Sequence, residues 1–310
     1  MADTKWIPGL HAKMSVTEAA QRVLSIRLGH VLERLPAAVE HPDEDIEHVH
    51  QLRVGTRRAA AAVRIFAGTL GANLHRRIRR TLKAIRRGAG AARDWDIFLE
   101  SINTRLRRRT VSQQAGLDFL LGFGQGHRAA AQEYLRHATD GQSDKLRRLM
   151  DEIGKPSHAA AQAQTLREVA IPMLTALQHE FEQGARGDLH AYEALHQVRI
   201  KGKQLRYAME VFESCFDAAF RMRVYPSIAE MQEILGTAND SHVADVMLEQ
   251  LRMHMERVQP AAWKRYRPAV EQLQLYHRRR LPRQRALFEK WWEKWQSSGL
   301  SAALTKWLKA

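Results

Sequence analysis

The residues that could do chemistry in this sequence are cations with no acids beside them. The stretch HVHQLRVGTRR, residues 48–58, carries two histidines and three arginines but no acidic residue. Between His48 and Arg93 there are twelve lysines and arginines and no aspartate or glutamate. Like charges four residues apart on a helix cost roughly 0.2–0.5 kcal/mol per pair, and a solvated helix face usually interleaves glutamate. The pattern therefore indicates a surface that binds a polyanion, because a polyanion would offset this repulsion.

A helix would separate these cations from the apolar residues around them. On a helical wheel of about 100° per residue, one side carries the cations His50, Arg53, Arg57 and Arg64. Leu52 and Phe66 fall near the opposite side, where they would face a core. His48 lies about 200° from His50, so the two histidines cannot share a metal ion on this helix.

The next expected helix, LHRRIRRTLKAIRRG at 74–88, has a wider basic face. Its apolar positions are Leu74, Ile78, Leu82 and Ile85, and its basic positions are Arg76, Arg79, Arg80, Lys83, Arg86 and Arg87. Cations three or four residues apart lie about 5–6 Å from one another, and arginine takes phosphate oxygens through two parallel hydrogen bonds. A chain of phosphates could therefore follow the row. Single-stranded nucleic acid would need aromatic residues among the cations for base stacking, and this face has none.

The same pattern occurs twice in the chain. A shift of 146 residues places HQLRV at 50–54 on HQVRI at 196–200, and the register continues without a gap to residues 97 and 243. The cations of the second occurrence are His196, Arg199, Lys203 and Arg206. Self-similarity of this kind indicates two copies of one helical unit.

The two copies differ in charge. Glu210 stands where the first copy has Arg64. The helix that follows in the second copy contains Pro226 and the acids Glu230 and Glu233. The first copy should therefore present the stronger anion-binding surface.

Helices are expected to position all of these residues. Long runs have a 3.6-residue period, and no segment alternates apolar and polar residues as a strand would, so the sequence predicts an all-α protein. Short loops indicate two pseudo-symmetric antiparallel four-helix bundles. The predicted parts are a first bundle at 15–138, a linker at 139–157, a second bundle at 158–297 and a C-terminal tail at 298–310. The glycine-containing stretches 88–94 and 236–240 are expected to separate helices, with Asp94 and Asp240 capping the helices that follow.

Composition limits the class of partner and the compartment. The chain has 310 residues and a formal net charge of +15, with a pI of about 10.3. Such a chain usually meets DNA, RNA, an acidic membrane face or a phosphate polymer, although a generally basic proteome would also produce it. The single cysteine, Cys215, excludes an intramolecular disulfide and favours a reducing compartment. No apolar run reaches about 18 residues and the N-terminus lacks the apolar core of a signal peptide, so we expect a cytoplasmic protein without a membrane span.

Metal and catalytic chemistry have weaker support. The sequence contains no HExxH motif, no Gly-rich phosphate loop and no nucleophile elbow. Asp94 and Asp96 are the best candidates for a metal-binding carboxylate pair, but helix capping and pairing with arginine explain them more simply. We therefore expect no catalytic residue, no metal and no cofactor. The C-terminal Trp291, Trp292 and Trp295 are expected to close a bundle, with docking on a membrane or a partner as the alternative.

The recurring motifs resemble the CHAD family, the conserved histidine α-helical domain. A helix HQLRVGTRR…RIF followed by IRRGAGAARDWDIF recurs as HQVRIKGKQLRYAMEVF followed by MQEILGTANDSHVADV. The resemblance covers roughly residues 15–297 and implies one domain, 1–310, of two four-helix bundles with a basic groove or pore between them. The positions that match the family motif are His50, Arg53, Arg57, Arg58, His196, Arg199, Lys203 and Arg206. The residues AAAA at 59–62 depart from the family's first copy, which commonly continues with basic residues.

The resemblance implies binding of inorganic polyphosphate and association with polyphosphate granules. The ExExK signature of the triphosphate-tunnel enzyme domain that often accompanies CHAD modules is absent. We therefore expect a stand-alone module that binds long-chain polyphosphate without turning it over. Granule proteins are further expected partners, and the protein should be a monomer or a homodimer. The alternatives are a basic architectural protein that binds duplex nucleic acid and, with less support, an enzyme that acts on polyphosphate.

Overall fold

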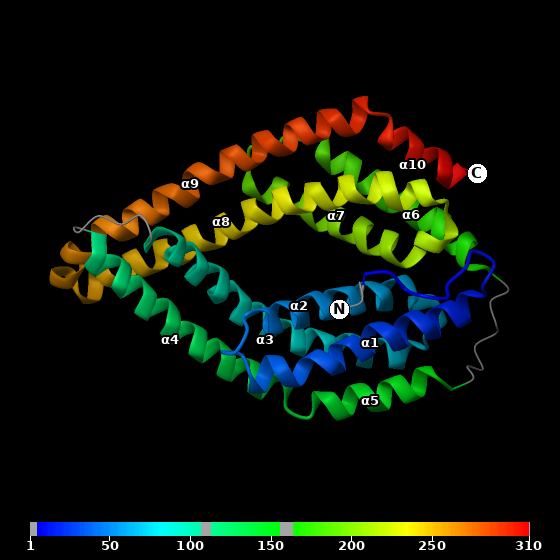
Figure 1. Ribbon diagram of the computed structural model, residues 1–310, viewed down its shortest axis with the longest axis horizontal. Helices are drawn as coiled ribbons and strands as arrows, with labels where there is room; N and C mark the ends of the chain where they lie inside the picture. Colours follow the sequence, from blue (N-terminus) through cyan, green and yellow to red (C-terminus); the bar gives the residue numbers. More distant parts are fainter. Residues whose placement is uncertain (1–4, 107–112, 156–163, 310) are drawn as a thin grey trace.

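The computed structural model describes residues 5–106, 113–155 and 164–309, and this part of the chain is all-helical. Figure 1 shows an elongated assembly in which α3 and α4 run side by side to one end of the molecule, as do α8 and α9. The helices are α1 (Val16–Glu40), α2 (Glu47–Ile65), α3 (Ala72–Leu106), α4 (Gln114–Thr139), α5 (Gln142–Ile153), α6 (Leu166–Ala185), α7 (Tyr192–Phe212), α8 (Tyr225–Val258), α9 (Pro260–Ser297) and α10 (Leu300–Lys309). The prediction of an all-α fold is confirmed.

Two matching helix starts join the two halves of the chain. Ser15 caps α1 by accepting a hydrogen bond from the Glu18 backbone N–H, and the Glu18 carboxylate accepts one in return from the Ser15 N–H. Thr165 and Glu168 form the same capping box at the start of α6. Such a box satisfies two backbone donors that a helix start otherwise leaves free. Ser15 and Thr165 also pair as an antiparallel bridge, so α1 and α6 begin side by side.

The apolar side chains form two cores. The larger core collects residues from α1–α8, the end of α9 and α10. The smaller core lies at the far end, where the C-terminal half of α3, α4, the C-terminal half of α8 and the start of α9 meet. Phe66 and Phe212 are buried, as their helical phase predicted. Trp291 and Trp295 are also buried in the larger core, and Trp292 packs against it, so the C-terminal tryptophans close the bundle.

The predicted breaks at 88–94 and 236–240 are wrong, because α3 and α8 run through them as continuous helices. Asp94 and Asp240 consequently lie inside helices and do not cap them. Glycine inside a helix costs about 1 kcal/mol relative to alanine, and close packing accounts for its presence at Gly88. A Cβ at Gly88 would lie 2.9 Å from the Cα of Leu135 in α4, so this glycine lets the backbones of α3 and α4 approach.

The stretch 139–157 is not a simple connection. Residues 142–153 form α5, which buries Leu146, Leu149 and Ile153 against α1 and α3. The expected tail likewise contains α10, whose Leu304 and Leu308 are buried. Periodicity in such short amphipathic helices is a weak signal, so only packing distinguishes them from linkers. Parts of all three predicted segments lie outside the described residues: 107–112 of the first bundle, 156–157 of the linker and 158–163 of the second bundle.

Candidate anion-binding site

Basic side chains from both halves of the chain meet where α2 packs against α7. The central cluster comprises Arg53 and Arg57 of α2 and Arg199 and Lys203 of α7. All four positions were predicted as candidate anion ligands, but the sequence could not show that the two pairs converge. Gly90 of α3 makes room for this cluster, since a Cβ there would lie 2.8 Å from Arg53 Nη1.

Burial and crowding weaken the positive charge of the central cluster. Burial lowers the pKa of Lys203 to about 5, with Arg199, Arg57 and Arg53 lowering it further. Burial and the neighbouring Arg57 lower the pKa of Arg53 to about 10. Both effects oppose the charged form of a basic group. An anion placed among these side chains would therefore relieve a repulsion that exists in the free protein.

Only a few groups offset the charge of the central cluster. Arg53 Nη2 lies 3.4 Å from Asp94 Oδ1. The negative charge of Asp240 favours the charged forms of Arg53 and Arg199. Burial raises the pKa of Asp94, which Arg53 partly counters. Arg199 is 8% exposed, and its buried Nε has no hydrogen-bond partner among the residues that the structure describes. A buried donor without an acceptor is costly, so an anion would complete this site.

Arg58 and Arg206, two further predicted ligands, have an internal partner instead. Arg58 Nε lies 2.8 Å from Glu210 Oε2, and Arg206 Nη1 lies 3.7 Å from Glu210 Oε1. Arg27 Nη2 approaches the same carboxylate to 3.6 Å, and Tyr225 donates a hydrogen bond of 2.8 Å to it. Glu210 is 1% exposed. Three arginines therefore neutralise a buried carboxylate, and with Tyr225 they connect α1, α2, α7 and α8.

Sequence reasoning noticed Glu210 but not its role. The residue was visible as the acid that replaces Arg64 in the repeat. Arg27 and Tyr225, its other partners, come from separate helices and carry no motif that would have grouped them with it. Buried ion pairs of this kind depend on packing between distant segments, which a single sequence does not show.

The two motif histidines are half-buried at the edges of the central cluster. Burial and then Arg93 lower the pKa of His50, and burial and then Arg199 lower that of His196. His196 also contacts the Tyr192 hydroxyl at 3.2 Å through Nδ1. The lowered pKa values disfavour the charged form of both histidines in the free protein.

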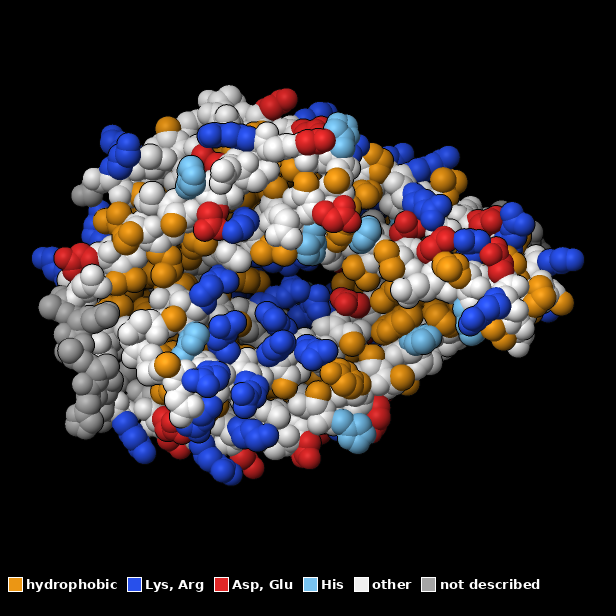
Figure 2. Space-filling model, turned by 180° about the vertical axis from the view of Figure 1, so that it is seen from behind, with side chains coloured by type: hydrophobic (Ala, Val, Ile, Leu, Met, Phe, Trp, Pro, Cys, Tyr) orange, Lys and Arg blue, Asp and Glu red, His pale blue; other side chains and the backbone are white. Residues whose placement is uncertain are grey.

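The basic face of α3 is exposed and open to solvent. It borders a pocket of about 770 Å³ lined by Ala60, Arg64, Ala67, Ala72, His75, Arg76, Arg79, Arg80, Leu82, Lys83 and Arg86. The structure thus brings together six of the predicted ligands, whereas Arg87 is exposed outside the lining. Throughout the described chain, no carboxylate lies within ion-pair distance of the lining arginines or of Lys83. Lysine and arginine side chains gather around a hollow on one face of the molecule (Figure 2).

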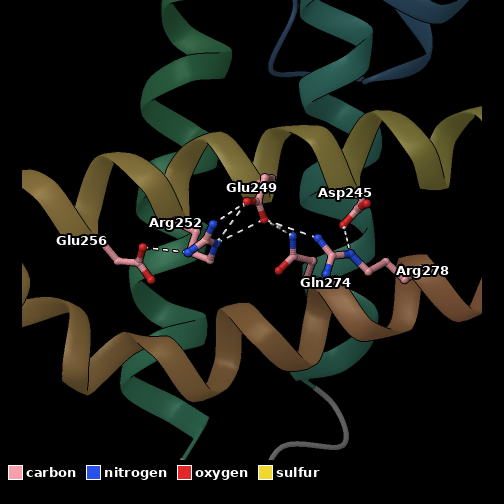
Figure 3. A network of polar contacts seen from close by, with 6 residues as sticks. All are labelled: Asp245, Glu249, Arg252, Glu256, Gln274 and Arg278. Carbon is pink, nitrogen blue, oxygen red and sulfur yellow. Dashed lines mark hydrogen bonds and ion pairs between the residues drawn. The ribbon is translucent and has the colours of Figure 1, made fainter.

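Arginines at the far end of the molecule are arranged differently. Figure 3 shows Arg252 and Arg278 bound by the carboxylates of α8. Arg252 Nη2 lies 2.5 Å from Glu249 Oε1, and Arg278 Nε lies 2.9 Å from Asp245 Oδ1. Hydrogen bonds from Arg252 and Gln274 hold the pKa of Glu249 well below its usual range. The α3 face therefore differs from this end of the molecule, where carboxylates hold both of these arginines.

The remaining candidate sites are engaged in structural contacts. Asp94 pairs with Arg53, and Asp96 Oδ1 accepts a hydrogen bond of 2.7 Å from Arg128 Nε. Among the described residues, no three His, Cys, Asp or Glu side chains are placed to hold a metal ion. Burial raises the pKa of the Cys215 thiol to about 12, which suits a packing role. No described helix is both long enough and apolar enough to cross a membrane.

Comparison with known proteins identifies the same architecture elsewhere. The family model for the CHAD domain matches residues 22–249. The crystal structure of the CHAD domain from the plant Ricinus communis is 22% identical and covers 99% of this chain and 96% of that chain, with a TM-score of 0.66. PptA from Streptomyces chartreusis is 18% identical and covers 90% of this chain and 100% of that chain, with a TM-score of 0.70. No curated protein matches the sequence. At these identities the two structures show a shared fold.

Proposed function

This chain belongs to the CHAD family, which is associated with polyphosphate binding, and from that premise we propose that it binds long-chain inorganic polyphosphate without turning it over. The observation that carries the proposal is the exposed row of α3 cations that have no carboxylate partners in the described chain. A linear polyanion supplies the missing negative charge at regular intervals. Arginine forks would take two phosphate oxygens at a time, and Lys83 would act as a point charge.

The groove between the two halves of the chain belongs to the same proposal. We propose one domain made of two copies of a helical unit, 15–138 and 158–297, that share a basic groove. The matched caps at Ser15 and Thr165 and the packing of α2 on α7 support this arrangement. Under it, polyphosphate contacts the α3 face and also reaches the central cluster.

A titration against chains of graded length tests the function. Affinity should rise with chain length and fall steeply with salt, because each phosphate contact releases a bound counterion. The variant Arg79→Gln/Lys83→Gln removes two exposed cations from the pocket lining and should reduce the slope of log K against log salt by about two. The charge-matched control Lys290→Gln/Lys294→Gln removes two exposed cations of α9 and should leave the slope nearly unchanged. Equal binding of short and long chains per molecule would contradict the proposal.

Competition distinguishes polyphosphate from duplex nucleic acid. No Phe, Tyr or Trp lines the pocket on α3, which disfavours base stacking but leaves backbone contacts to a duplex available. Excess polyphosphate should displace DNA easily, and DNA should displace polyphosphate poorly. The reverse order would identify a nucleic-acid-binding architectural protein.

We propose no enzymatic role for this chain. The carboxylates best placed by sequence to hold a metal, Asp94 and Asp96, are paired with Arg53 and Arg128. Polyphosphate incubated with the protein should keep its length distribution with and without Mg²⁺. Shortening that depends on the protein would overturn this part of the proposal.

In the cell we propose a cytoplasmic protein on polyphosphate granules, acting as a monomer or homodimer with granule proteins as further partners. A basic surface that binds long chains would hold the protein wherever such chains accumulate. A fluorescent fusion should therefore coincide with granules, and the Arg79→Gln/Lys83→Gln fusion should be more diffuse than the Lys290→Gln/Lys294→Gln fusion.

A further inference from the structure

A second basic pocket lies on a neighbouring face of α3, where α5 packs against it. It has a volume of about 290 Å³ and is lined by Arg77, Arg80, Thr81, Ala84, Gln142, Lys145, Arg148 and Leu149. Helix α5 occupies a stretch that the sequence suggested was a linker. Neither Lys145 nor Arg148 belongs to a recognised motif in this chain, so this pocket emerges only from the packing of α5 on α3.

The charges in this pocket are open to a ligand. Arg80, Lys145 and Arg148 are exposed, and none of them forms an ion pair with a carboxylate of the described residues. Arg77 is different, because it holds the Glu152 carboxylate through two hydrogen bonds of 2.7 and 2.8 Å. Glu152 is thereby neutralised at the edge of the pocket. The polar groups of Thr81 and Gln142 complete a lining suited to a hydrated anion.

One residue connects the two pockets. Arg80 lines both the pocket on the α3 face and the pocket between α3 and α5. Along α3 the first lining runs from Ala72 to Arg86, and fourteen residues of helix span about 21 Å. A short polyanion can be accommodated within that length. A longer polyanion must extend beyond the first pocket, and Arg80 is a cation that it can contact on the way to α5.

We propose that the α3–α5 pocket is a second binding subsite for the same polyphosphate chain, reached across Arg80 and used only by chains too long for the first pocket. This inference rests on the proposed function and adds chain-length selection to it. Once one part of a long chain is bound, the effective concentration of its remainder at the second subsite is high. A short chain has no such advantage, and two charges exposed to solvent would hold it weakly.

The test compares two ligands on the variant Lys145→Gln/Arg148→Gln. Affinity for polyphosphate of about 100 units should fall roughly fivefold to tenfold, as expected for losing two exposed charge contacts. Affinity for tripolyphosphate should stay within about twofold of the wild type, because tripolyphosphate fits within the first pocket. The conservative exchange Lys145→Arg/Arg148→Lys keeps both charges and should retain long-chain affinity.

Matched controls separate a local subsite from general loss of charge. Lys290→Gln/Lys294→Gln removes the same net charge from α9. Arg147→Gln changes the same helix, α5, at an exposed residue that pairs with Asp144 and lines neither pocket. If Lys145→Gln/Arg148→Gln bound long chains as tightly as these control variants do, the second subsite would be overturned while the proposed function would stand. Equal weakening of tripolyphosphate and long chains would also overturn it, and a wild-type protein that binds no polyphosphate would overturn the proposed function as well.

Discussion

Polyphosphate binding near pH 8 should draw about one proton onto Lys203. In the free protein the Lys203 side chain is half-buried among Arg53 and Arg57 of α2 and Arg199 of α7, and its pKa is lowered to about 5. It is therefore neutral at pH 8. A phosphate chain in the central cluster would favour the charged amine, because a nearby anion raises the pKa of a basic group.

The size and sign of the effect follow from the two pKa values. The pKa of Lys203 is about 5 in the free protein and should be near the ordinary value of about 10.4 in the complex. At pH 8 the fraction of Lys203 that is protonated therefore changes from nearly zero to nearly one. A group whose pKa rises on binding takes up a proton, so affinity falls as pH rises between the two values. The logarithm of the association constant should decrease by about one per pH unit in this window. Burial also lowers the pKa values of His50 and His196 in the free protein, and a bound anion would raise them.

Calorimetry in buffers of different ionisation enthalpy measures this proton directly. At pH 8.5 the wild type should take up close to one proton per bound chain, whereas Lys203→Arg, which stays charged, should take up almost none. Lys203→Met should also show no uptake and should bind more weakly than Lys203→Arg. Uptake near zero in the wild type, or equal uptake in the wild type and Lys203→Arg, would show that Lys203 does not gain a proton on binding.

The free protein offers an independent check on Lys203. Its folded-state pKa of about 5 lies below the unfolded value of about 10.4, so the unfolded chain binds more protons between these pH values. Stability therefore rises with pH across this window. Lys203→Met should flatten that rise and raise the free energy of unfolding at pH 7 by about 1–3 kcal/mol. Urea denaturation at several pH values measures both effects.

Two further predictions concern the packing that positions the site. Glu210→Gln should lower the free energy of unfolding by about 3–5 kcal/mol, because the buried Arg27 and the half-buried Arg58 lose a shared carboxylate. A loss below about 1 kcal/mol in urea denaturation would contradict the assigned role. Gly88→Ala should cost about 1–3 kcal/mol, since the new Cβ would lie 2.8 Å from Leu135 Cδ1. Gly122 lies on an exposed turn of α4, and a Cβ there would have no atom within 4 Å. Gly122→Ala should therefore stabilise the protein by up to about 1 kcal/mol. Thermal unfolding of the Gly88→Ala and Gly122→Ala variants would show whether close packing explains Gly88.

Local pattern was sufficient to predict the helices and the division of their faces. The 3.6-residue period placed Phe66 and Phe212 in the core and the cations of 76–86 on a solvent face, and the structure agrees. Periodicity is reliable for such features because the geometry of one helix determines which of its residues share a side. The same reasoning failed at 88–94, where glycine suggested a turn. A helical glycine and a turn glycine look alike until the neighbouring helix that requires it, here α4, is in place.

The amino-acid sequence alone was enough to show that this chain is helical, strongly basic, repeated in its motifs and similar to CHAD proteins. Which cations remain available to an anion became apparent only from the packing of the helices. Arg58 is committed to Glu210, 152 residues away, whereas Arg79 and Lys83 face an open pocket. The packing also shows that Lys203 loses its charge in the free protein and that α5 supplies a second basic pocket. The physical reason is that burial and Coulomb interactions depend on distances between segments far apart in the chain, and those distances exist only once the helices have packed.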